Sequence, residues 1–465
     1  MKIKFTEREN RIIDSILTVF RDSGLVPYLV GGYVRNKLIG ITPKDFDIAS
    51  SMLPHEIVER GKALGFEYCD IVNEKLGTVL LIIDGEKIEH TTFRKESYPA
   101  GGSHEPSEIT IGVSMQEDAM RRDFSVNALY ADLRTGEVLD PTGRGLEDIR
   151  LKRLRSATED PEVMIKDDAL RLLRLVRFAC QLEFDIDSEL ANKARIYSSQ
   201  LASVSKERIA KEMDGILLAD ADDNEKRTHN NGSRAVVLLE NLGLMRILIP
   251  EFEDYRHIGY GTYHKYSVYI HTAHVVGNVP ADKVLKYAAL LHDVAKPMIW
   301  RTTGTMHGHD IAGEEIAYSR MLAMGHDKKL SREVAVLVRE HMYDLRGDAK
   351  ENKIRKKIQT LGYETFERLI ELRRADFLGS GREKEPVRTA DKFTRIMDQM
   401  KDQKVPMQLS ELNIRGSDII KAYNIRGRMI GEVLDRLLSY CCVHPLKNTK
   451  DNLLREAGNI LRNLN

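Results

Sequence analysis

A change in hydrophobic periodicity divides the sequence, and it most constrains what the chain can fold into. Up to about residue 145, short apolar runs alternate with turn residues, as in YLVGG (28–32), TVLLIID (78–84) and KIEHTTF (87–93). Such runs are typical of strands, and they stand among segments with helical spacing, such as residues 7–22. From about residue 160 onward the spacing is almost entirely helical. We therefore predict an α/β N-terminal domain with a small mixed sheet, followed by all-α regions.

Bulk composition excludes several classes of protein. The 465 residues contain 71 Lys plus Arg and 71 Asp plus Glu, so any nucleic-acid site must come from local clustering of basic residues. The four cysteines form no CxxC pair, which argues against a zinc ribbon or a disulfide framework. No apolar stretch has the length of a membrane span, and the N-terminus does not resemble a signal peptide. We expect a cytoplasmic protein with no membrane partner. The composition does not indicate an oligomeric state.

The stretch KDFDIAS (44–50) places Asp45 and Asp47 one residue apart on a predicted strand. Side chains alternate along a strand, so both carboxylates are expected on one face, where their like charges repel. A divalent cation removes that cost, and Mg²⁺ prefers carboxylates together with phosphate oxygens. Glu89, on a later predicted strand, is a candidate third ligand. The alternative interpretation is a solvated strand end.

A diglycine precedes these carboxylates at a predicted junction between strand and helix. Gly31 and Gly32 have no side chains there, so phosphate oxygens can approach the backbone amides. Arg35 follows on the predicted helix, and its guanidinium can bind a phosphate with two hydrogen bonds. Together, the glycines, the arginine and the three acidic residues predict a metal-dependent site for a nucleoside triphosphate.

The segment LVGGYVRNKLIGITPKDFDIAS (29–50) closely resembles the head-domain signature of polymerase-β-like nucleotidyltransferases. In particular it is similar to class II tRNA nucleotidyltransferases (CCA-adding enzymes) and bacterial poly(A) polymerases. RRDFSVNALY (121–130), LDPTGRGLEDI (139–149), DDALRLLRLVRFACQLEFDID (167–187) and VSKERIAKEM (204–213) continue the resemblance in order. It implies that Asp45 and Asp47 bind Mg²⁺ and act with Glu89 in catalysis. It also places Arg122 and Asp123 near the sugar and triphosphate.

Asp168 and Arg171 are three residues apart on a predicted helix, so we expect them on one face. A carboxylate accepts from an exocyclic amino group, and a guanidinium donates to ring acceptors, a combination that suits both C and A. The resemblance makes this pair the protein template for CTP and ATP. Arg174, three residues further along the same predicted helix, would face the base or a phosphate. The alternative is a surface salt bridge. Arg122, Asp123 and Asn127 are expected on the inner side of a helix within 115–132, with helix packing as the alternative for Asn127.

Two features depart from the family pattern. Asp167 stands where glutamate is usual, and the loop RKESYPAGGSHEPSEIT (94–110) has His104-Glu105-Pro106 where many relatives have a basic segment. In the family this loop helps to switch specificity from CTP to ATP. The departure therefore concerns the addition of the final A and not nucleotidyl transfer itself.

Histidines recur in or beside apolar helical stretches in the second half of the chain. Their order resembles that of the HD phosphohydrolases, with these candidate ligands: His271, His292, Asp293, His309, His341 and Asp376. Imidazole and carboxylate together suit Mn²⁺, Ni²⁺, Fe or Mg²⁺, and a metal-bound water can attack a phosphoester. The resemblance implies phosphatase and 2′,3′-cyclic phosphodiesterase activity. A degenerate, purely structural HD fold is the alternative.

The resemblance gives a four-part organisation and a function. The parts are a head (1–148), a neck (149–222), a body containing the HD domain (223–380) and a tRNA-binding tail (381–465), with polar stretches at 222–233 and 380–388 near the boundaries. In the tail, a basic cluster is a candidate tRNA contact or a set of solvated helix ends: Arg415, Lys421, Arg426 and Arg428. We expect addition of C, C and A to tRNA from CTP and ATP. A poly(A) polymerase, a CC-only enzyme and an HD phosphohydrolase with an inactive RNA-binding head remain alternatives.

Overall fold

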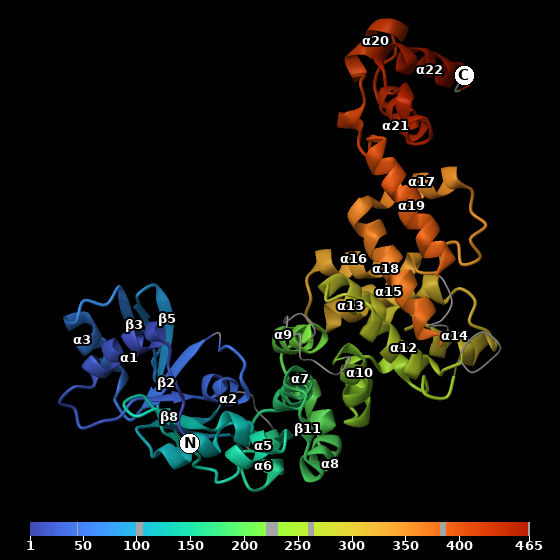
Figure 1. Cartoon of the computed structure of the whole chain (residues 1–465). Coiled ribbons are helices and arrows are strands. Elements are labelled where there is room, and N and C mark those ends of the chain that lie inside the picture. The colour runs from blue at the N-terminus through green and yellow to red at the C-terminus, as the bar shows by residue number, and fades with distance from the viewer. Residues whose placement is uncertain (44, 99–105, 220–230, 259–264, 382–386, 464–465) are drawn as a thin grey trace. The chain divides into compact units, whose positions relative to one another are not determined.

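The computed structural model describes the whole chain except residues 44, 99–105, 220–230, 259–264, 382–386 and 464–465. The chain divides into two compact units, Met1–Pro250 (unit 1) and Glu251–Asn465 (unit 2). Both boundary stretches predicted from composition fall largely outside the described residues. Figure 1 shows strands and helices in the blue and green part of the chain and helices in the yellow to red part.

Unit 1 is built on a mixed sheet, as the strand-like runs predict. Its seven strands lie in the order β3-β4-β5-β2-β1-β8-β9, and β2 and β5 are parallel while the other neighbours are antiparallel. The sheet strands are β1 (Tyr28–Val30), β2 (Phe46–Ser50), β3 (Tyr68–Asn73), β4 (Thr78–Ile83), β5 (Glu86–Thr92), β8 (Tyr130–Asp132) and β9 (Val138–Leu139). Two further pairs join β6 (Arg94–Ser97) to β7 (Glu108–Ile111) and β10 (Arg153–Leu154) to β11 (Asp185–Ile186).

Helices complete unit 1 and cover its core. They are α1 (Glu7–Val19), α2 (Gly32–Ile39), α3 (Pro54–Ala63), α4 (Met115–Met120), α5 (Gly145–Arg150), α6 (Pro161–Asp167), α7 (Arg171–Leu182), α8 (Ser188–Ile196), α9 (Lys206–Leu217), α10 (Asn231–Asn241) and α11 (Met245–Leu248). The apolar face of α1 packs Ile12, Ile13 and Ile16 against Leu29 and Ile48 of the sheet. Thr6 and Glu9 form a capping box that starts this helix.

Two helix predictions in unit 1 were wrong. The segment 115–132 forms the short helix α4, a 3₁₀ turn at Ser125–Asn127 and strand β8, because Tyr130 and its neighbours pair with β1 and are fully buried. Asp168 lies between α6 and α7 in an extended conformation, and its side chain accepts a hydrogen bond from the Leu170 amide. Asp168 and Arg171 therefore do not share a helix face.

Unit 2 is helical throughout its described residues. Its helices are α12 (Val268–Asn278), α13 (Lys283–Leu291), α14 (Lys296–Thr303), α15 (His309–Ala323), α16 (Lys328–Glu340), α17 (Glu351–Leu361), α18 (Tyr363–Gly379), α19 (Arg388–Asp402), α20 (Gly416–Tyr423), α21 (Arg428–Val443) and α22 (Lys450–Arg462). All four cysteines of the chain are buried. None of the helices formed by described residues combines the length and apolar character that crossing a membrane requires.

Candidate active sites

The parallel pairing of β2 with β5 brings two of the predicted carboxylates together. Asp47 is directly opposite Glu89 in this register, so their side chains lie on the same face of the sheet. Asp45 lies just before β2 rather than in it. Burial raises the pKa of Asp47 to about 6, and the negative charges of Glu89 and Asp45 add to that rise. The three carboxylates therefore form a site whose charge favours a bound cation.

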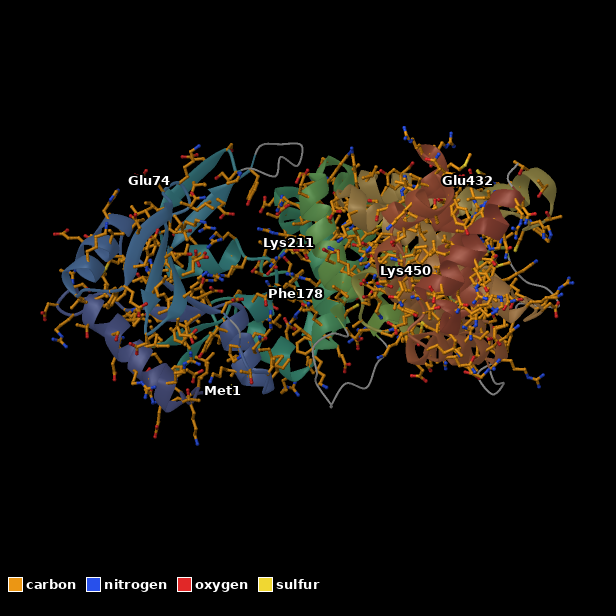
Figure 2. The ribbon with its side chains drawn as sticks, turned by 90° about the horizontal axis from the view of Figure 1, so that it is seen from above. Met1, Glu74, Phe178, Lys211, Glu432 and Lys450 are labelled. Carbon is orange, nitrogen blue, oxygen red and sulfur yellow. The ribbon has the colours of Figure 1, made fainter. Side chains whose placement is uncertain are left out.

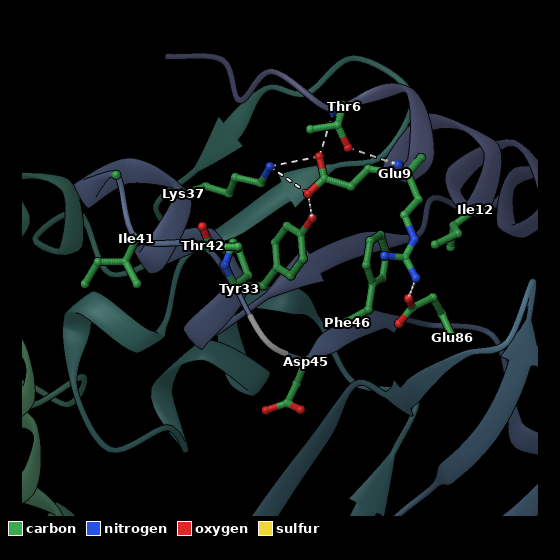
Figure 3. Close-up of a pocket in the computed structure, with 13 residues that line it drawn as sticks. Thr6, Glu9, Ile12, Tyr33, Lys37, Ile41, Thr42, Asp45, Phe46 and Glu86 are labelled. Atoms are coloured by element: carbon green, nitrogen blue, oxygen red, sulfur yellow. Dashed lines mark hydrogen bonds and ion pairs between the residues drawn. The ribbon is translucent and has the colours of Figure 1, made fainter. Parts of the chain in front are cut away.

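Two cavities of unit 1 adjoin these carboxylates. Asp47 lines one of about 430 Å³, and Asp45 lines a second of about 550 Å³. In the second, Thr6, Tyr33 and Lys37 converge on the Glu9 carboxylate, whereas the Asp45 carboxylate points away from Glu9 (Figure 3). The polar groups of that cavity are thus paired with Glu9, and the cavity beside Asp47 holds the other predicted nucleotide-binding residues.

The diglycine forms the wall of the Asp47 cavity at the start of α2. Gly31 has a φ of +65°, which side chains rarely tolerate, and a Cβ there would lie 3.2 Å from an Arg122 Nη1. Arg35 is buried and donates to Asn127 Oδ1 from the same cavity. Burial, with repulsion from two neighbouring arginines, lowers the pKa of Arg35 to about 10, so it stays charged at neutral pH. Glycine backbone and a fixed guanidinium meet here as the sequence predicts.

Residues 121–130 (RRDFSVNALY, here the RRDF segment) supply the middle of the cavity, although they do not form the predicted α-helix. Asn127 Nδ2 donates to Asp123 Oδ1 at 2.9 Å, and Asp123 Oδ2 lies 2.7 Å from Arg174 Nη2. Arg122 donates to the buried Asp118 at 3.0 Å. Asp118 was not predicted from the sequence, but its i, i+4 spacing from Arg122 was a usable signal. Hydrogen bonds and ion pairs, and not a shared helix face, thus hold Arg122, Asp123 and Asn127 in place.

The ion pair at Asp123 predicts a specific acid sensitivity. Burial opposes its ionisation, but Arg174 and the Asn127 amide outweigh burial and lower its pKa to about 2, against 3.8 for a free aspartate. The folded state therefore gains stability above pH 3.8 and loses it as the pH falls toward 2. We expect the difference in free energy of unfolding between the parent and Asp123→Asn to decrease by about 1 kcal/mol from pH 5 to pH 3. Urea unfolding followed by circular dichroism measures this difference.

The exposed Asp14 on α1 provides the matched control for that experiment. Asp14→Asn removes one carboxylate from the same unit without removing a buried ion pair. Its difference from the parent should change little over the same pH range. An Asp123→Asn difference that stays constant down to pH 3 would contradict the assigned ion pair.

The predicted base-reading pair meets in the Asp47 cavity despite the break between α6 and α7. Asp168 and Arg171 both line it. Arg208, on α9, lies 2.6 Å from Asp168 Oδ2, and Arg171 donates to the Arg121 and Met164 carbonyls at 2.7 and 3.2 Å. Arg208 was missed from the sequence, although VSKERIAKEM places it four residues before the buried Glu212, on one helix face.

The second candidate site lies in unit 2, where the six predicted ligands form two groups. One contains His271, His292 and Asp376, the other Asp293, His309 and His341, and within each group the ligand atoms lie within 4.8 Å of one another. They come from five places: α12, the end of α13, the first residue of α15, the end of α16, and α18.

Asp293 lies between the two groups and belongs to both in geometry. Its Oδ2 is 3.2 Å from His292 Nε2 and 3.6 Å from His271 Nε2, while its Oδ1 is 3.3 Å from His309 Nε2 and 3.8 Å from His341 Nε2. The carboxylate is fully buried. A pair of cations bridged by this one carboxylate fits the arrangement.

The orientation of the imidazoles agrees with metal binding. The Nδ1 atoms of His309 and His341 contact the Met306 and Val338 carbonyls at 2.7 and 2.6 Å, and carbonyls only accept, so these nitrogens carry the protons. The Nε2 lone pairs then face each other at 3.1 Å beside Asp293. Two imidazole lone pairs that converge beside a carboxylate favour a cation.

The charges of the metal-free cluster point the same way. Burial beside other imidazoles lowers the pKa of His341 to about 3, so it is neutral. At His292 burial opposes protonation, but Asp293 and Asp376 outweigh it and raise its pKa. The cluster thus attracts positive charge. Two buried cations that were not predicted flank the cluster. Lys296 lies 2.6 Å from Asp293, and Arg373 lies 3.7 Å from Asp376.

Three family profiles match the chain in order. They are the poly A polymerase head domain over residues 27–155, the probable RNA- and SrmB-binding site of polymerase A over residues 183–256, and the HD domain over residues 262–400. The order agrees with the positions of the two candidate sites.

Curated relatives match the N-terminal half. The CCA-adding enzyme of Streptococcus pyogenes serotype M2 (strain MGAS10270) is 40% identical over 207 residues, which is 44% of this chain and 48% of the relative. The same protein from serotype M5 (strain Manfredo) gives the same values. The chain thus aligns with about half the length of these relatives.

Solved structures match nearly the whole chain. The Bacillus stearothermophilus CCA-adding enzyme in complex with CTP has a TM-score of 0.69 at 22% identity, with 99% of each chain covered. The Thermotoga maritima CCA-adding enzyme complexed with tRNA has a TM-score of 0.61 at 16% identity, covering 98% of this chain and 96% of that one. At these identities the likeness establishes the fold.

Proposed function

The chain belongs to the family of CCA-adding enzymes and bacterial poly(A) polymerases with an HD domain, and we propose that it adds C, C and A to tRNA 3′ ends from CTP and ATP. One observation carries the proposal. A single cavity joins Asp47, which pairs with Glu89 across two strands, to the arginines and to the Asp168–Arg171 pair. Nucleotidyl transfer needs a catalytic cation, a polyphosphate site and a base reader next to one another.

Asp45, Asp47 and Glu89 would hold Mg²⁺ in this reaction. When bound, the metal would lower the pKa of the attacking tRNA 3′-hydroxyl and stabilise the charge that develops on the transferred phosphate. The carboxylates fit this role because burial, together with their mutual repulsion, raises the pKa of Asp47 in the metal-free protein. The hydroxyl then attacks the α-phosphate in line, and pyrophosphate leaves.

Gly31, Gly32, Arg35 and Arg174 would bind the triphosphate. Both arginines line the Asp47 cavity, and the glycine backbone leaves room for phosphate oxygens. Three residues of the RRDF segment would orient these groups and the sugar: Arg122, Asp123 and Asn127. Their hydrogen bonds run from Arg35 through Asn127 and Asp123 to Arg174, so the two phosphate-binding arginines are held relative to each other.

Asp168 and Arg171 would select the base. Cytosine and adenine both present an amino group next to a ring acceptor, which a carboxylate and a guanidinium can read together, whereas guanine and uracil present a carbonyl there. Arg208 fixes one Asp168 oxygen, and the Leu170 amide fixes the other. This anchoring supports a reader of constant geometry for C and A.

Unit 2 would hydrolyse phosphoesters at its histidine–aspartate cluster, as a second activity suited to damaged tRNA ends. The cluster would hold divalent cations such as Mn²⁺, Ni²⁺ or Mg²⁺, which would activate a water and bind phosphate oxygens. Two groups of ligands joined by the shared Asp293 support this proposal.

We also propose roles for the four parts of the chain. The parts 1–148, 149–222, 223–380 and 381–465 would serve as head, neck, HD-containing body and tail. The tail would contact tRNA phosphates through Arg415, Lys421, Arg426 and Arg428, all of which lie on or beside helices α20 and α21. Because its proposed substrate is tRNA, the protein would act in the cytoplasm.

Incorporation with purified protein, Mg²⁺ and a tRNA lacking its last three nucleotides tests the proposed function. We expect two additions with CTP alone and three with CTP and ATP, read at single-nucleotide resolution. A stop after two with both nucleotides would indicate a CC-only enzyme, whose loop 94–110 does not permit the switch. Long products with ATP alone would indicate a poly(A) polymerase, and no addition would leave the HD cluster as the sole enzyme. Residues 99–105 of that loop, with His104 and Glu105, lie outside the described residues.

A further inference from the structure

One phenyl ring in unit 1 contacts three guanidinium groups. The ring of Phe178, on α7, lies 5.0 Å from the Arg35 guanidinium carbon, 5.3 Å from that of Arg174 and 4.8 Å from that of Arg177, measured to the ring centroid. Phe178 is 8% exposed and lines the Asp47 cavity where the sheet of unit 1 meets its helices (Figure 2). Such distances are those of cation–π interactions.

The carboxylates nearby balance only part of this charge. Arg174 lies 2.7 Å from Asp123 and 3.7 Å from Glu212, and Arg177 lies 3.1 Å from Glu212. Within ion-pair distance, the three cations thus share two carboxylates, so these ion pairs leave one positive charge unbalanced. Two of the three cations, Arg35 and Arg174, line the cavity.

The packing around Arg177 fits a ring that holds guanidinium groups. Arg177 passes over Gly215 of α9, where a Cβ would lie 2.7 Å from the Arg177 Cδ. A larger residue at that position would push the arginine off its path to the ring. Arg35 and Arg174 are among the described residues that line the cavity, whereas Arg177 is not.

From this arrangement we propose that Phe178 is a positioning residue for the triphosphate of the incoming nucleotide. This proposal rests on the proposed function of unit 1 as a nucleotidyltransferase. The ring draws together Arg35 from α2 and Arg174 from α7, which would otherwise repel each other, and it keeps both guanidinium groups turned toward one polyphosphate. An aromatic face does this without neutralising them, whereas a third carboxylate would cancel the charge that attracts the anion.

Binding of Mg²⁺–CTP and of CMP to the full chain without RNA tests the proposal. We expect Phe178→Leu to raise the Kd for CTP about tenfold or more, because two cation–π contacts to phosphate-binding arginines are lost. The Kd for CMP should rise less, since CMP lacks the β- and γ-phosphates. Phe178→Tyr keeps the aromatic face and should bind CTP within about threefold of the parent.

Phe184→Leu is the matched control, since this buried phenyl lies just beyond α7 and is not among the described residues that line the cavity. It should leave CTP binding unchanged. Affinity for CTP within twofold of the parent in Phe178→Leu, or an equal loss in Phe178→Tyr and Phe178→Leu, would overturn the proposal. A parent that binds CTP but extends no RNA would overturn the proposed function alone, and a parent that binds no CTP would overturn both.

Discussion

Replacing Asp45 and Asp47 together by alanine is expected to reduce nucleotide addition on the order of 10⁴-fold or more. The expectation rests on the Asp47–Glu89 pairing, because removal of two of three carboxylates leaves Glu89 alone to hold a catalytic cation. Loss of the metal removes several kcal/mol of transition-state stabilisation, and each 1.36 kcal/mol is a factor of ten in rate. The measurement is single-turnover extension of tRNA ending in CC, with saturating ATP.

The arginines of the cavity are untouched in this double variant, so CTP binding without metal should persist. This separates a catalytic defect from loss of the nucleotide site. Asp70→Ala, which removes an exposed carboxylate from β3 in the same unit, is the matched control and should extend tRNA at the rate of the parent. Addition within tenfold of the parent in the double variant would refute the assignment of Asp45 and Asp47 as metal ligands. Hydrolysis by unit 2 should be unaffected.

The strand residues of the first site were predictable because the side-chain period of a strand is short and strict. KDFDIAS and KIEHTTF each contain a strand, and the pairing of β2 with β5 places Asp47 opposite Glu89. Asp45, expected on the same strand as Asp47, lies just before β2. That these two strands are neighbours, although residues 51–85 lie between them, is a long-range fact that local periodicity does not contain. The mixed sheet and helical remainder were confirmed, whereas the strand order came only from the structure.

The helical residues of the site were harder to predict because polar side chains compete with the backbone. Asp168 and Asp123 both accept hydrogen bonds from nearby amides, those of Leu170 and Phe124. Asp168 is the C-cap of α6, whereas α4 already ends at Met120, before Asp123. The residues still meet in one cavity, through contacts such as that of Arg208 with Asp168 across 40 positions of sequence. The sequence motifs thus predicted which residues lie together in the cavity, and tertiary packing determined the contacts that hold them there.

The histidine–aspartate order in unit 2 predicted the members of the second cluster but not its division into two groups. The spacing of His271, His309 and His341 places them on separate helices, and only the packing of these helices shows that Asp293 lies between the groups. Lys296 was visible in the sequence three residues after Asp293, and it is the first residue of α14. Its contact with the carboxylate, and the burial of both side chains, came only from the structure.

Asp293→Asn is therefore expected to have the largest effect of any single change in unit 2. An amide cannot supply two anionic oxygens to two cations, so both groups of ligands lose their shared member. We expect bound metal, measured by elemental analysis after dialysis, to fall at least tenfold and hydrolysis of a 2′,3′-cyclic nucleotide to fall on the order of 100-fold or more. Nucleotide addition by unit 1 should remain within threefold of the parent.

Two comparisons make this result decisive. Asp310→Asn changes the carboxylate next to His309 that lies outside both ligand groups, and it should keep the metal content and hydrolysis of the parent. The single tryptophan, Trp300 on α14, provides a readout independent of activity, because that helix begins at Lys296 beside Asp293. Titration with Mn²⁺ should change its fluorescence in the parent and in Asp310→Asn but not in Asp293→Asn. Retention of the parent's metal by Asp293→Asn would show that the cluster does not bind metal through this carboxylate, and the second activity would then have to be assigned elsewhere.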